Sequence, residues 1–527
     1  MKLTKTFATL LLLTAANAYA QTQCPVIPKP VAATVAAGTF ALNRNIAITP
    51  ARFTQAAAYL HNELQHIENI PASGQHKAAV KFVQASLKDK NPEAYELTIK
   101  PDGIQIRANS ELGAFNGAVT LLQLAKHDGA ELKTWTINDA PQYAWRGIML
   151  DESRHFFGKE KVKSLIDWMA YYKLNRLHWH LTDEPGWRIA VSQYPKLTTV
   201  GGTGNYTNPN APATYYTKAD ISEILQYAKA RDIIVFPEID MPGHATAANH
   251  AYPEFSGGGS KGHPEFTFNP GKEATYAYLT NILRDINGQF GTNMLHLGGD
   301  EVSYGNEKWS TDSSILALMQ REHLTTPRQV ELYFMQRMAD SVYKMNAKLL
   351  AWDEMAEVSL PKDKTIIFWW RHDKPNTLQT ALDNGYSTVV CPRLPLYFDF
   401  VQDSTNKYGR KWSGQYNSIE NVYNFSPDKY LAAGANKSLI MGMQANLWTE
   451  TVSSPERLDY LLFPRICALA EICWTRPAAK NQEDFMERLK PQLALFKAAG
   501  LYYYDPFDPK LHAEPVPAKK TVSDYKD

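Results

Sequence analysis

After Pro141 the chain repeats one pattern, in which a short apolar run is followed by a loop and, in most cases, by an amphipathic stretch. Short runs of apolar and β-branched residues predict strands, whereas apolar residues spaced three and four apart predict helices. The predicted strands are Arg146–Leu150, Arg176–Leu181, Ile233–Ile239, Met294–Leu297, Leu349–Trp352, Thr365–Trp370, Ser387–Cys391 and Leu439–Ala445. The predicted helices between them are Lys159–Tyr172, Lys218–Ala230, Ala274–Ile286, Thr326–Met345 and Thr377–Asn384. Strands that alternate with helices in this way predict a (β/α)8 barrel, an α/β fold, over residues 141–505.

A doubly wound parallel sheet would show a similar alternation of strands and helices. Sheets of that type that bind dinucleotides carry a Gly-rich phosphate turn directly after the first strand. No such turn follows Arg146–Leu150. The barrel is therefore the favoured fold.

Residues 21–140 show a different pattern, with short strands and two helices, which predicts a small α+β domain before the barrel. The two helices are expected at Phe53–Glu68 and Leu112–Ala125. At the other end of the chain a final helix is expected from Pro455 to Cys473, and residues 506–527 form a C-terminal tail. The segment Leu394–Tyr430 is long, aromatic and without a clear helix, which is typical of a functional loop.

Residues 1–20 have the three parts of a signal peptide. Lys2 and Lys5 give a positive start, Phe7–Ala16 is apolar, and Ala18-Tyr19-Ala20 is a small-x-small cleavage site. This predicts an exported protein, periplasmic or secreted, and the short leader that begins with lysines is typical of bacteria. No later run approaches the ~20 apolar residues of a membrane-spanning helix, so no transmembrane segment is expected.

The charge and the cysteine content limit the partners and the covalent links of the chain. It has 55 Lys and Arg against 54 Asp and Glu, a net charge of +1, so no basic field that would attract nucleic acid is expected. Cys467 and Cys473 fall on one predicted helix, too far apart to bridge. Cys24 and Cys391 could pair with each other or with neither, and we expect mostly free cysteines.

Polar and aromatic residues follow nearly every predicted barrel strand. Active sites of (β/α)8 barrels are built at the carboxyl ends of the strands. A ring of such residues is hard to explain by packing, so it predicts a functional site. The ring comprises Asp151, Arg154, His178, His180, Asp183, Glu238, Asp240, His244, Asp300, Glu301, Trp352, Asp353, Glu354, Trp370, Arg371, Tyr397, Asp399, Trp448 and Glu450.

Three chemistries compete for this ring, and the first is metal-dependent hydrolysis. His178-Trp179-His180 resembles the His-x-His of metal-dependent amidohydrolases. That fold places the pair on its first strand and adds a bridging lysine, whereas the middle strands here end in carboxylates and tryptophan. His178 and His180 point to the same side of their strand. We therefore expect them to hydrogen-bond neighbouring carboxylates, and we expect no metal.

The second chemistry is sugar binding without catalysis. It would use Trp352, Trp370 and Trp448 as platforms, because a flat ring matches the apolar face of a sugar. It leaves the pair Asp300-Glu301 with no purpose except a buried ion pair.

The third chemistry, glycoside hydrolysis, gives that pair a purpose. Glu301 lies beside the carboxylate of Asp300 among tryptophans, and repulsion and partial desolvation would give it the raised pKa that a general acid needs. Adjacent residues rarely flank a bond as acid and nucleophile do. In substrate-assisted enzymes, however, the 2-acetamido group of the sugar attacks instead, and the second carboxylate holds that group.

Several motifs on successive strands resemble the β-N-acetylhexosaminidases of glycoside hydrolase family 20. The resemblance runs from about Gln142 to Trp474, and the segment before Pro141 looks like the small domain that precedes this barrel in the family. The matching motifs are Arg146-Gly147-Ile148-Met149-Leu150-Asp151, His178-Trp179-His180-Leu181-Thr182-Asp183, Pro237-Glu238-Ile239-Asp240-Met241-Pro242-Gly243-His244, His296-Leu297-Gly298-Gly299-Asp300-Glu301, Ala351-Trp352-Asp353-Glu354 and Leu447-Trp448-Thr449-Glu450.

The resemblance implies a role for each matching residue. Glu301 corresponds to the general acid, which later acts as the base, and Asp300 to the residue that orients the 2-acetamido group. Tyr397 corresponds to the tyrosine that donates to the acetamide oxygen. Trp369 departs from the family pattern and is expected to pack on the other side of its strand from Trp370. The other implied roles are aromatic walls at Trp352, Trp370 and Trp448, outer-hydroxyl contacts at Arg154, Asp399 and Glu450, and a pair supporting the acid at Asp183 and His244.

The activity that the resemblance implies is exo-acting, retaining and independent of cofactors. The substrate would be a glycan with a terminal β-linked N-acetylglucosamine or N-acetylgalactosamine. Related enzymes release a disaccharide instead, as lacto-N-biosidases do, and the loops Gly201–Tyr216 and Leu394–Tyr430 would decide between the two products. The sequence specifies no oligomeric state.

Overall fold

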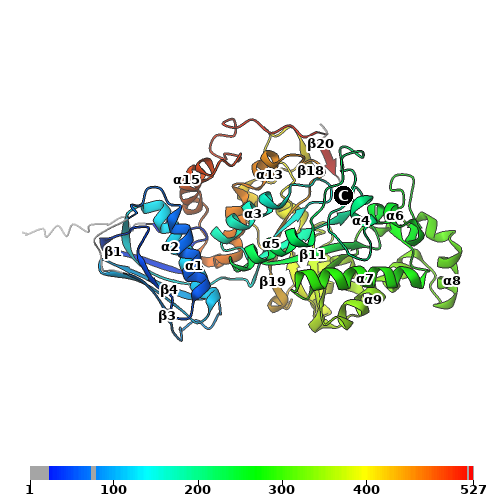
Figure 1. The fold of residues 1–527 in the computed structure, drawn as a ribbon, viewed down its shortest axis with the longest axis horizontal. Helices are drawn as coiled ribbons and strands as arrows, with labels where there is room; N and C mark the ends of the chain where they lie inside the picture. Colours follow the sequence, from blue (N-terminus) through cyan, green and yellow to red (C-terminus); the bar gives the residue numbers. More distant parts are fainter. Residues whose placement is uncertain (1–22, 73–78, 519–521, 526–527) are drawn as a thin grey trace, which may run out of the picture.

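The computed structural model describes residues 23–72, 79–518 and 522–525, and the predicted signal peptide lies outside these ranges. A mixed sheet with two helices forms one end of the molecule, and a barrel with its surrounding helices forms the rest (Figure 1). No helix among the described residues is both long and apolar enough to cross a bilayer.

The barrel is closed and all of its strands are parallel. Its order is β11-β14-β15-β16-β17-β19-β7-β8, so that the last strand along the chain pairs with the first. Each strand overlaps one predicted from the sequence, and the predicted fold is confirmed. The bounds are β7 Trp145–Asp151, β8 Arg176–His180, β11 Ile234–Met241, β14 Met294–Gly298, β15 Lys348–Trp352, β16 Thr365–Trp369, β17 Ser387–Val390 and β19 Ile440–Leu447.

Helices follow most of the barrel strands at the predicted places. Their starts have clear local causes: Thr217 and Asp220 form a capping box at α5, and Thr326 caps α9 just before Pro327. The main helices between the strands are α3 Lys159–Tyr171, α5 Lys218–Lys229, α7 Glu273–Phe290, α9 Pro327–Lys344 and α10 Pro375–Asp383.

The predicted helix from Pro455 to Cys473 is wrong, because two helices occupy this segment. They are α13 Pro455–Leu462 and α14 Arg465–Trp474. Pro464 lies between them, and proline has no N–H to continue a helix and clashes with the preceding turn. Cys467 and Cys473 both lie in α14, and all four cysteines of the chain are free, as expected.

The N-terminal sheet has the order β1-β6-β4-β5-β3-β2. Its strand β6, Glu131–Asp139, was not predicted, although it pairs with both β1, Ala32–Ala41, and β4, Tyr95–Lys100. The other strands are β2 Ala47–Thr49, β3 Ala79–Gln84 and β5 Gly103–Ala108, and the helices are α1 Thr54–Gln65 and α2 Glu111–Asp128.

Helix α2 lies against this sheet, where two glycines allow the close approach. A Cβ atom at Gly117 would lie 2.6 Å from a methyl group of Ile106, and one at Gly113 would lie 2.2 Å from the Ala94 carbonyl oxygen. On its other side, α2 contacts the barrel, since Gln123 Nε2 donates to the Tyr171 carbonyl oxygen at 2.7 Å. The helix therefore joins the two parts of the molecule.

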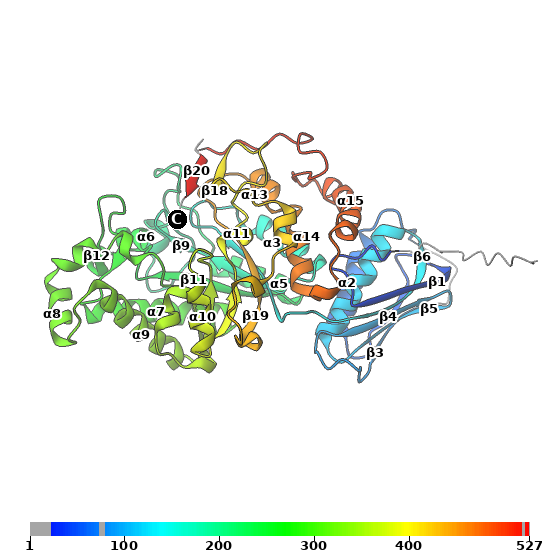
Figure 2. The same ribbon diagram turned by 180° about the vertical axis from the view of Figure 1, so that it is seen from behind.

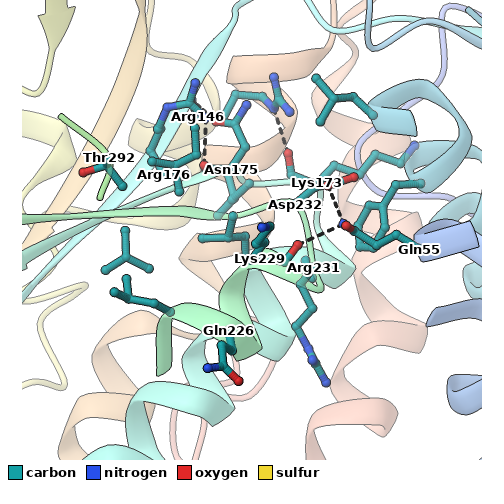
Figure 3. A pocket seen from close by; sticks show the side chains of 18 of the residues that line it. Gln55, Arg146, Lys173, Asn175, Arg176, Gln226, Lys229, Arg231, Asp232 and Thr292 are labelled. Carbon is teal, nitrogen blue, oxygen red and sulfur yellow. Dashed lines mark hydrogen bonds between the residues drawn. The ribbon is translucent and has the colours of Figure 1, made fainter. Parts of the chain in front are cut away.

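Buried ion pairs strengthen this junction. Asp139 at the end of β6 accepts from Lys173 Nζ at 3.3 Å, from Tyr95 at 2.7 Å and from the indole of Trp474 at 2.9 Å. Arg146 of β7 forms a second buried pair, with Glu93. A cavity of about 780 Å³ lies beside these residues at the amino-terminal end of the barrel (Figure 3).

The chain does not end at the barrel. Helix α15, Gln482–Ala498, was not predicted; it lies beside the barrel near the N-terminal part, and the chain then runs back over the barrel (Figures 1 and 2). There the short strand β20, Val522–Tyr525, pairs in parallel with β18, Gly409–Trp412. Strand β18 and the short helix α12, Ile419–Tyr423, belong to the segment Leu394–Tyr430, which was predicted to have no clear helix.

The substitution Asp139→Ala should strongly destabilise the protein. It removes the carboxylate that faces the fully buried ammonium group of Lys173, and breaking one partner of a buried pair costs about 3–5 kcal/mol. Thermal and urea unfolding measure the change. Asp102→Ala, in an exposed turn of the same sheet, is the control and should change the free energy of unfolding by less than about 0.5 kcal/mol. Equal stability of the two variants would contradict this account.

Candidate active site

The predicted site residues come together at the carboxyl ends of the barrel strands. Each lies at the end of its strand or in the loop that follows it, and the parallel strands bring these ends to one side of the barrel. The contacts described below connect most of them, and Asp151, Asp353 and Arg371 join through ion pairs with Arg154, Arg371 and Asp353 respectively. They fall into an acidic turn after β14, a buried ion network, a group of aromatic rings and a charged outer edge.

The acidic turn, residues 298–301, begins at the last residue of β14, and three of its four residues have positive φ angles. Gly298 and Gly299 have φ angles of 67° and 90°. A Cβ atom at Gly298 would lie 1.7 Å from Asp240 Oδ1, so only glycine fits there. Glu301 has a φ angle of 51°, a costly conformation for a residue with a side chain. Strain of this kind is concentrated at functional sites, where the surrounding structure enforces it.

Both carboxyl groups of the turn are held toward their protonated form. Asp300 is 8% exposed, and burial followed by repulsion from Asp240 raises its pKa well above the ordinary value. Burial and then the charge of Glu354 raise the pKa of Glu301, whose side chain is 29% exposed. The sequence had pointed to Asp300 as the like charge beside Glu301, whereas the larger repulsion comes from Glu354 after β15.

His244 is the nearest cationic group to the turn. Its Nε2 lies 3.9 Å from Asp300 Oδ2 and 3.7 Å from Glu301 Oε2, and its Nδ1 lies 3.1 Å from Asp183 Oδ1. Burial lowers the pKa of His244, but Asp183 and Asp240 outweigh it and raise the pKa well above its ordinary value. His244 therefore faces the two carboxyl groups as an imidazolium.

Asp183 connects His244 to two further cationic groups. Its Oδ2 lies 2.7 Å from Arg154 Nη1 and 2.9 Å from His180 Nε2. Burial alone would raise the pKa of Asp183, but Arg154 and His244 hold it far below the ordinary value. Asp183 is thus a permanent carboxylate that fixes the position of the imidazolium.

Glu238, a residue to which the resemblance assigned no role, lies beneath this network in the barrel interior. Its Oε2 lies 3.0 Å from His178 Nε2 and 2.6 Å from His180 Nδ1, and its Oε1 lies 2.9 Å from His296 Nδ1. The indole of Trp352 donates to the same Oε1 at 2.9 Å. The expectation that a neighbouring carboxylate accepts a hydrogen bond is confirmed for His180, which contacts both Glu238 and Asp183. His178 Nε2 lies close to Glu238 but forms no hydrogen bond with the described residues.

Among the described residues, four overlapping sets of three side chains have ligand atoms within 4.8 Å of one another, the spacing that could hold a metal ion. They are His178, Glu238 and His296; His180, Asp183 and Asp240; Asp183, Glu184 and His244; and Asp240, His244 and Asp300. All of these residues except Glu184 are buried, and the first set is of a type that zinc accepts. In the structure the first set is already joined by the direct contacts to Glu238 described above.

Aromatic rings lie beside the acidic turn. The rings of Trp370 and Tyr397 are nearly parallel, with an angle of 12° between their planes and 6.4 Å between their centres. The Trp370 indole donates to Glu354 at 3.1 Å. The centre of the Trp448 ring lies 6.2 Å from that of Tyr397 and 6.1 Å from that of Trp352, a residue that is almost completely buried. Such rings match the apolar face of a sugar.

Three further aromatic and cationic residues extend or flank this group. Trp369 packs on the other side of β16 against Tyr430, at 4.9 Å, as expected. Arg393 and Trp412 were not predicted. The guanidinium of Arg393 lies 3.6 Å from the centre of the Trp412 ring. No motif marks either residue, because both belong to the long segment after β17.

The charged outer edge consists of Arg154, Asp399, Arg410 and Glu450. Glu450 Oε1 lies 2.7 Å from Arg410 Nη2 and 3.8 Å from Arg154 Nη2. Asp399 is 1% exposed and its Oδ2 lies 3.6 Å from Arg410 Nε. Burial raises the pKa of Asp399 to about 7, although Arg410 opposes the shift. Arg410 was not predicted from the sequence.

His244 should lose its proton only at a pH well above the ordinary histidine pKa near 6.5, because Asp183 and Asp240 raise its pKa. The substitution Asp183→Asn removes the largest favourable charge and should lower the pKa of His244 toward the ordinary value. Selective ¹³C labelling of histidine and NMR titration measure both. Asp220→Asn, at the surface end of α5, is the control and should leave the His244 signal unchanged. An unshifted His244 pKa in Asp183→Asn would refute the ion network as the cause.

Comparison with known proteins agrees with this geometry. Residues 143–477 match the model for the catalytic domain of glycosyl hydrolase family 20, and residues 23–140 match the model for domain 2 of that family. A beta-hexosaminidase of Porphyromonas gingivalis is 33% identical over 79% of this chain, which spans about half, 55%, of that relative. A beta-hexosaminidase of Vibrio furnissii is 30% identical over 84% of this chain and 76% of its own length.

Solved structures give the same result. A family 20 exo β-N-acetylglucosaminidase of Vibrio harveyi, in complex with N-acetylglucosamine, superposes with a TM-score of 0.84 and 31% identity, covering 92% of this chain and 79% of its own. A β-N-acetylhexosaminidase of Streptomyces coelicolor has a TM-score of 0.79 and 29% identity, covering 92% and 98%. With both family models matched in order, the chain belongs to glycosyl hydrolase family 20.

Proposed function

We propose that the protein is an exo-acting, retaining β-N-acetylhexosaminidase that removes terminal N-acetylglucosamine or N-acetylgalactosamine from a glycan. The observation that carries this proposal is the acidic turn, in which burial raises the pKa of both Asp300 and Glu301 beside aromatic rings. A raised pKa suits the acid that gives a proton, Glu301. At Asp300 the acetamide N–H and the developing positive charge of the substrate would favour the carboxylate form, which supports that charge.

Glu301 is the general acid in this proposal. Its raised pKa keeps a proton available for the leaving oxygen, and its partial exposure lets it reach a bound sugar. After the leaving group departs, the same carboxylate accepts a proton from water. The imidazolium of His244, 3.7 Å away, favours the carboxylate and so limits how far the pKa rises.

Asp300 holds the 2-acetamido group of the substrate. It is adjacent to Glu301 on one turn, so the two groups do not lie on opposite sides of a bond as acid and nucleophile do. Asp300 accepts the acetamide N–H while the acetamide oxygen attacks the anomeric carbon and forms a cyclic oxazolinium intermediate. Tyr397 donates to that oxygen, and Trp352, Trp370 and Trp448 surround the group. Water then opens the ring, and two inversions give overall retention.

The charged outer edge supports exo action on one terminal sugar. Arg154, Asp399 and Glu450 offer donors and acceptors that suit the outer hydroxyl groups of a sugar, and the salt bridges among them close this side of the site. Asp183 supports the acid through His244. A disaccharide product, as in a lacto-N-biosidase, would require more room there and is the alternative.

We also propose that the enzyme acts outside the cytoplasm, in the periplasm or the medium of a bacterium. The charge, the apolar run and the cleavage site of residues 1–20 support export. We infer a domain of residues 21–140 before a catalytic barrel of residues 141–505 and a tail of residues 506–527. The ranges matched by the two family models, 23–140 and 143–477, support this division.

Two aryl glycosides test the proposed activity. The enzyme should cleave the aryl β-N-acetylglucosaminide but not the β-glucoside, because only the first carries the attacking acetamido group. A thiazoline mimic of the oxazolinium intermediate should inhibit tightly, and EDTA should have no effect. Cleavage of the glucoside would refute substrate assistance, and loss of activity in EDTA would favour the metal chemistry of His178 and His180. Binding of the thiazoline without cleavage would point to the disaccharide product.

Substitutions in the acidic turn test the two roles. Glu301→Gln should lower kcat about 10²–10⁴-fold on substrates with ordinary leaving groups and less on aryl glycosides that need no proton. Asp300→Asn should lose most activity on both. With wild-type Glu301, activity should fall as the pH rises through its raised pKa, since the acid form is then lost. Wild-type turnover by Asp300→Asn would overturn the mechanism.

A further inference from the structure

We propose that Arg410 is a substrate-positioning residue, which holds Glu450 and Asp399 in place to accept hydrogen bonds from the outer hydroxyl groups of the terminal sugar. The inference rests on the proposed hexosaminidase activity and adds a residue to its site. Arg410 lies on β18, in the long segment after β17 whose path could not be predicted from the sequence. Its Nη2 pairs with Glu450 Oε1 at 2.7 Å, and its Nε lies 3.6 Å from Asp399 Oδ2.

The two carboxylates that face Arg410 keep acceptor atoms available. Glu450 Oε2 and both oxygens of Asp399 form no hydrogen bond with the described residues, although they are buried. A buried acceptor without a donor is costly, and sugar hydroxyl groups would supply the missing donors. Arg410 pairs with the other oxygen of Glu450, Oε1, to which Arg154 also lies close, so Oε2 stays available.

The main chain of Arg410 is fixed from two sides. Its carbonyl oxygen accepts from Val401 N at 3.0 Å, and β18 pairs with β20 of the C-terminal segment. Just before β18, the carboxylate of Glu514 accepts from the amide nitrogen of Tyr408 at 3.2 Å and pairs with the buried Arg457 at 3.0 Å. The C-terminal segment therefore holds the strand that presents Arg410.

Charge gives Arg410 a second effect on the same acceptors. The charged groups that face Asp399 are Arg410 of β18, Glu450 after β19 and Arg465 of α14. Burial raises the pKa of Asp399, and Arg410 is the largest influence that lowers it. Without Arg410, Asp399 would take up a proton at higher pH and lose part of its acceptor capacity.

Arg410→Gln should raise KM for the aryl β-N-acetylglucosaminide about tenfold or more while kcat changes less than about threefold, because binding by the outer hydroxyl groups is lost before and during the reaction alike. The rise should grow as the pH falls from about 8 to about 6, since the pKa of Asp399 is then higher. Arg410→Lys keeps the charge and should restore the pH profile, but not the full affinity, because lysine cannot span both carboxylates.

Substrates that lack one hydroxyl group separate positioning from a general structural effect. For the 4-deoxy or the 6-deoxy aryl glycoside, the ratio of KM between Arg410→Gln and wild type should fall toward one. Glu514→Gln, which does not touch the site, should raise KM in the same direction by a smaller factor. Arg321→Gln, at the exposed end of α8, Ser313–Arg321, is the matched control and should change neither constant.

An unchanged KM in Arg410→Gln, or an equal loss on the parent and on both deoxy substrates, would overturn the inference. If wild type cleaves no aryl hexosaminide, the proposed activity fails by itself. Calorimetric binding of N-acetylglucosamine and of its 4-deoxy and 6-deoxy forms to wild type and Arg410→Gln then gives the same comparison. Weaker binding of the parent sugar alone would support the role of Arg410, and equal binding would refute it.

Discussion

The buried carboxylate of Glu238 is the interaction on which the inside of the barrel depends. An ion in a protein interior is costly unless it is both paired and hydrogen-bonded. Glu238 meets this requirement through His180 of β8 and the indole of Trp352 of β15, which both hydrogen-bond it, and it also lies within 3.0 Å of His178 of β8 and His296 of β14. With β11, which carries Glu238, these are four neighbouring strands of the barrel. Displacing any one of them would leave the carboxylate short of a partner, so the ion fixes their relative positions.

From this centre, charges alternate outward until they reach the surface of the site. Glu238 contacts His180, His180 contacts Asp183, and Asp183 contacts His244, which faces the acidic turn. The inner carboxylates have lowered pKa values, and those of the turn have raised ones. The same functional group thus behaves in opposite ways, because the inner carboxylates lie beside the cationic side chains of His180, Arg154 and His244, whereas those of the turn face burial and like charge. A site that needs a protonated acid can therefore be built on top of permanently ionised ones.

Most of the fold and of the site follow from local sequence, and the rest depends on how distant segments meet. Apolar runs predicted each barrel strand, and because parallel strands end on one side, they also predicted which side chains gather there. Pro464 indicates a break between two helices, but the apolar periodicity on both sides of it led to the prediction of a single helix. Arg410 could not be found, because its contact with Glu450 depends on the path of a long loop. The repulsion of Glu301 by Glu354 has the same origin, since burial in space and not adjacency in sequence sets it.

The pairing of β19 with β7 has a consequence for how the chain folds. Gly442 lies opposite Trp145, so the last barrel strand must be present before the first can find its second neighbour. Contacts between residues so far apart in sequence form slowly, since the intervening chain must first be ordered. The contact of Glu514 with Arg457 can form only later still, because Glu514 follows the last barrel strand in the sequence. An emerging polypeptide therefore carries the early members of the site in unpaired form, and the barrel that holds them can close only after β19 has been made.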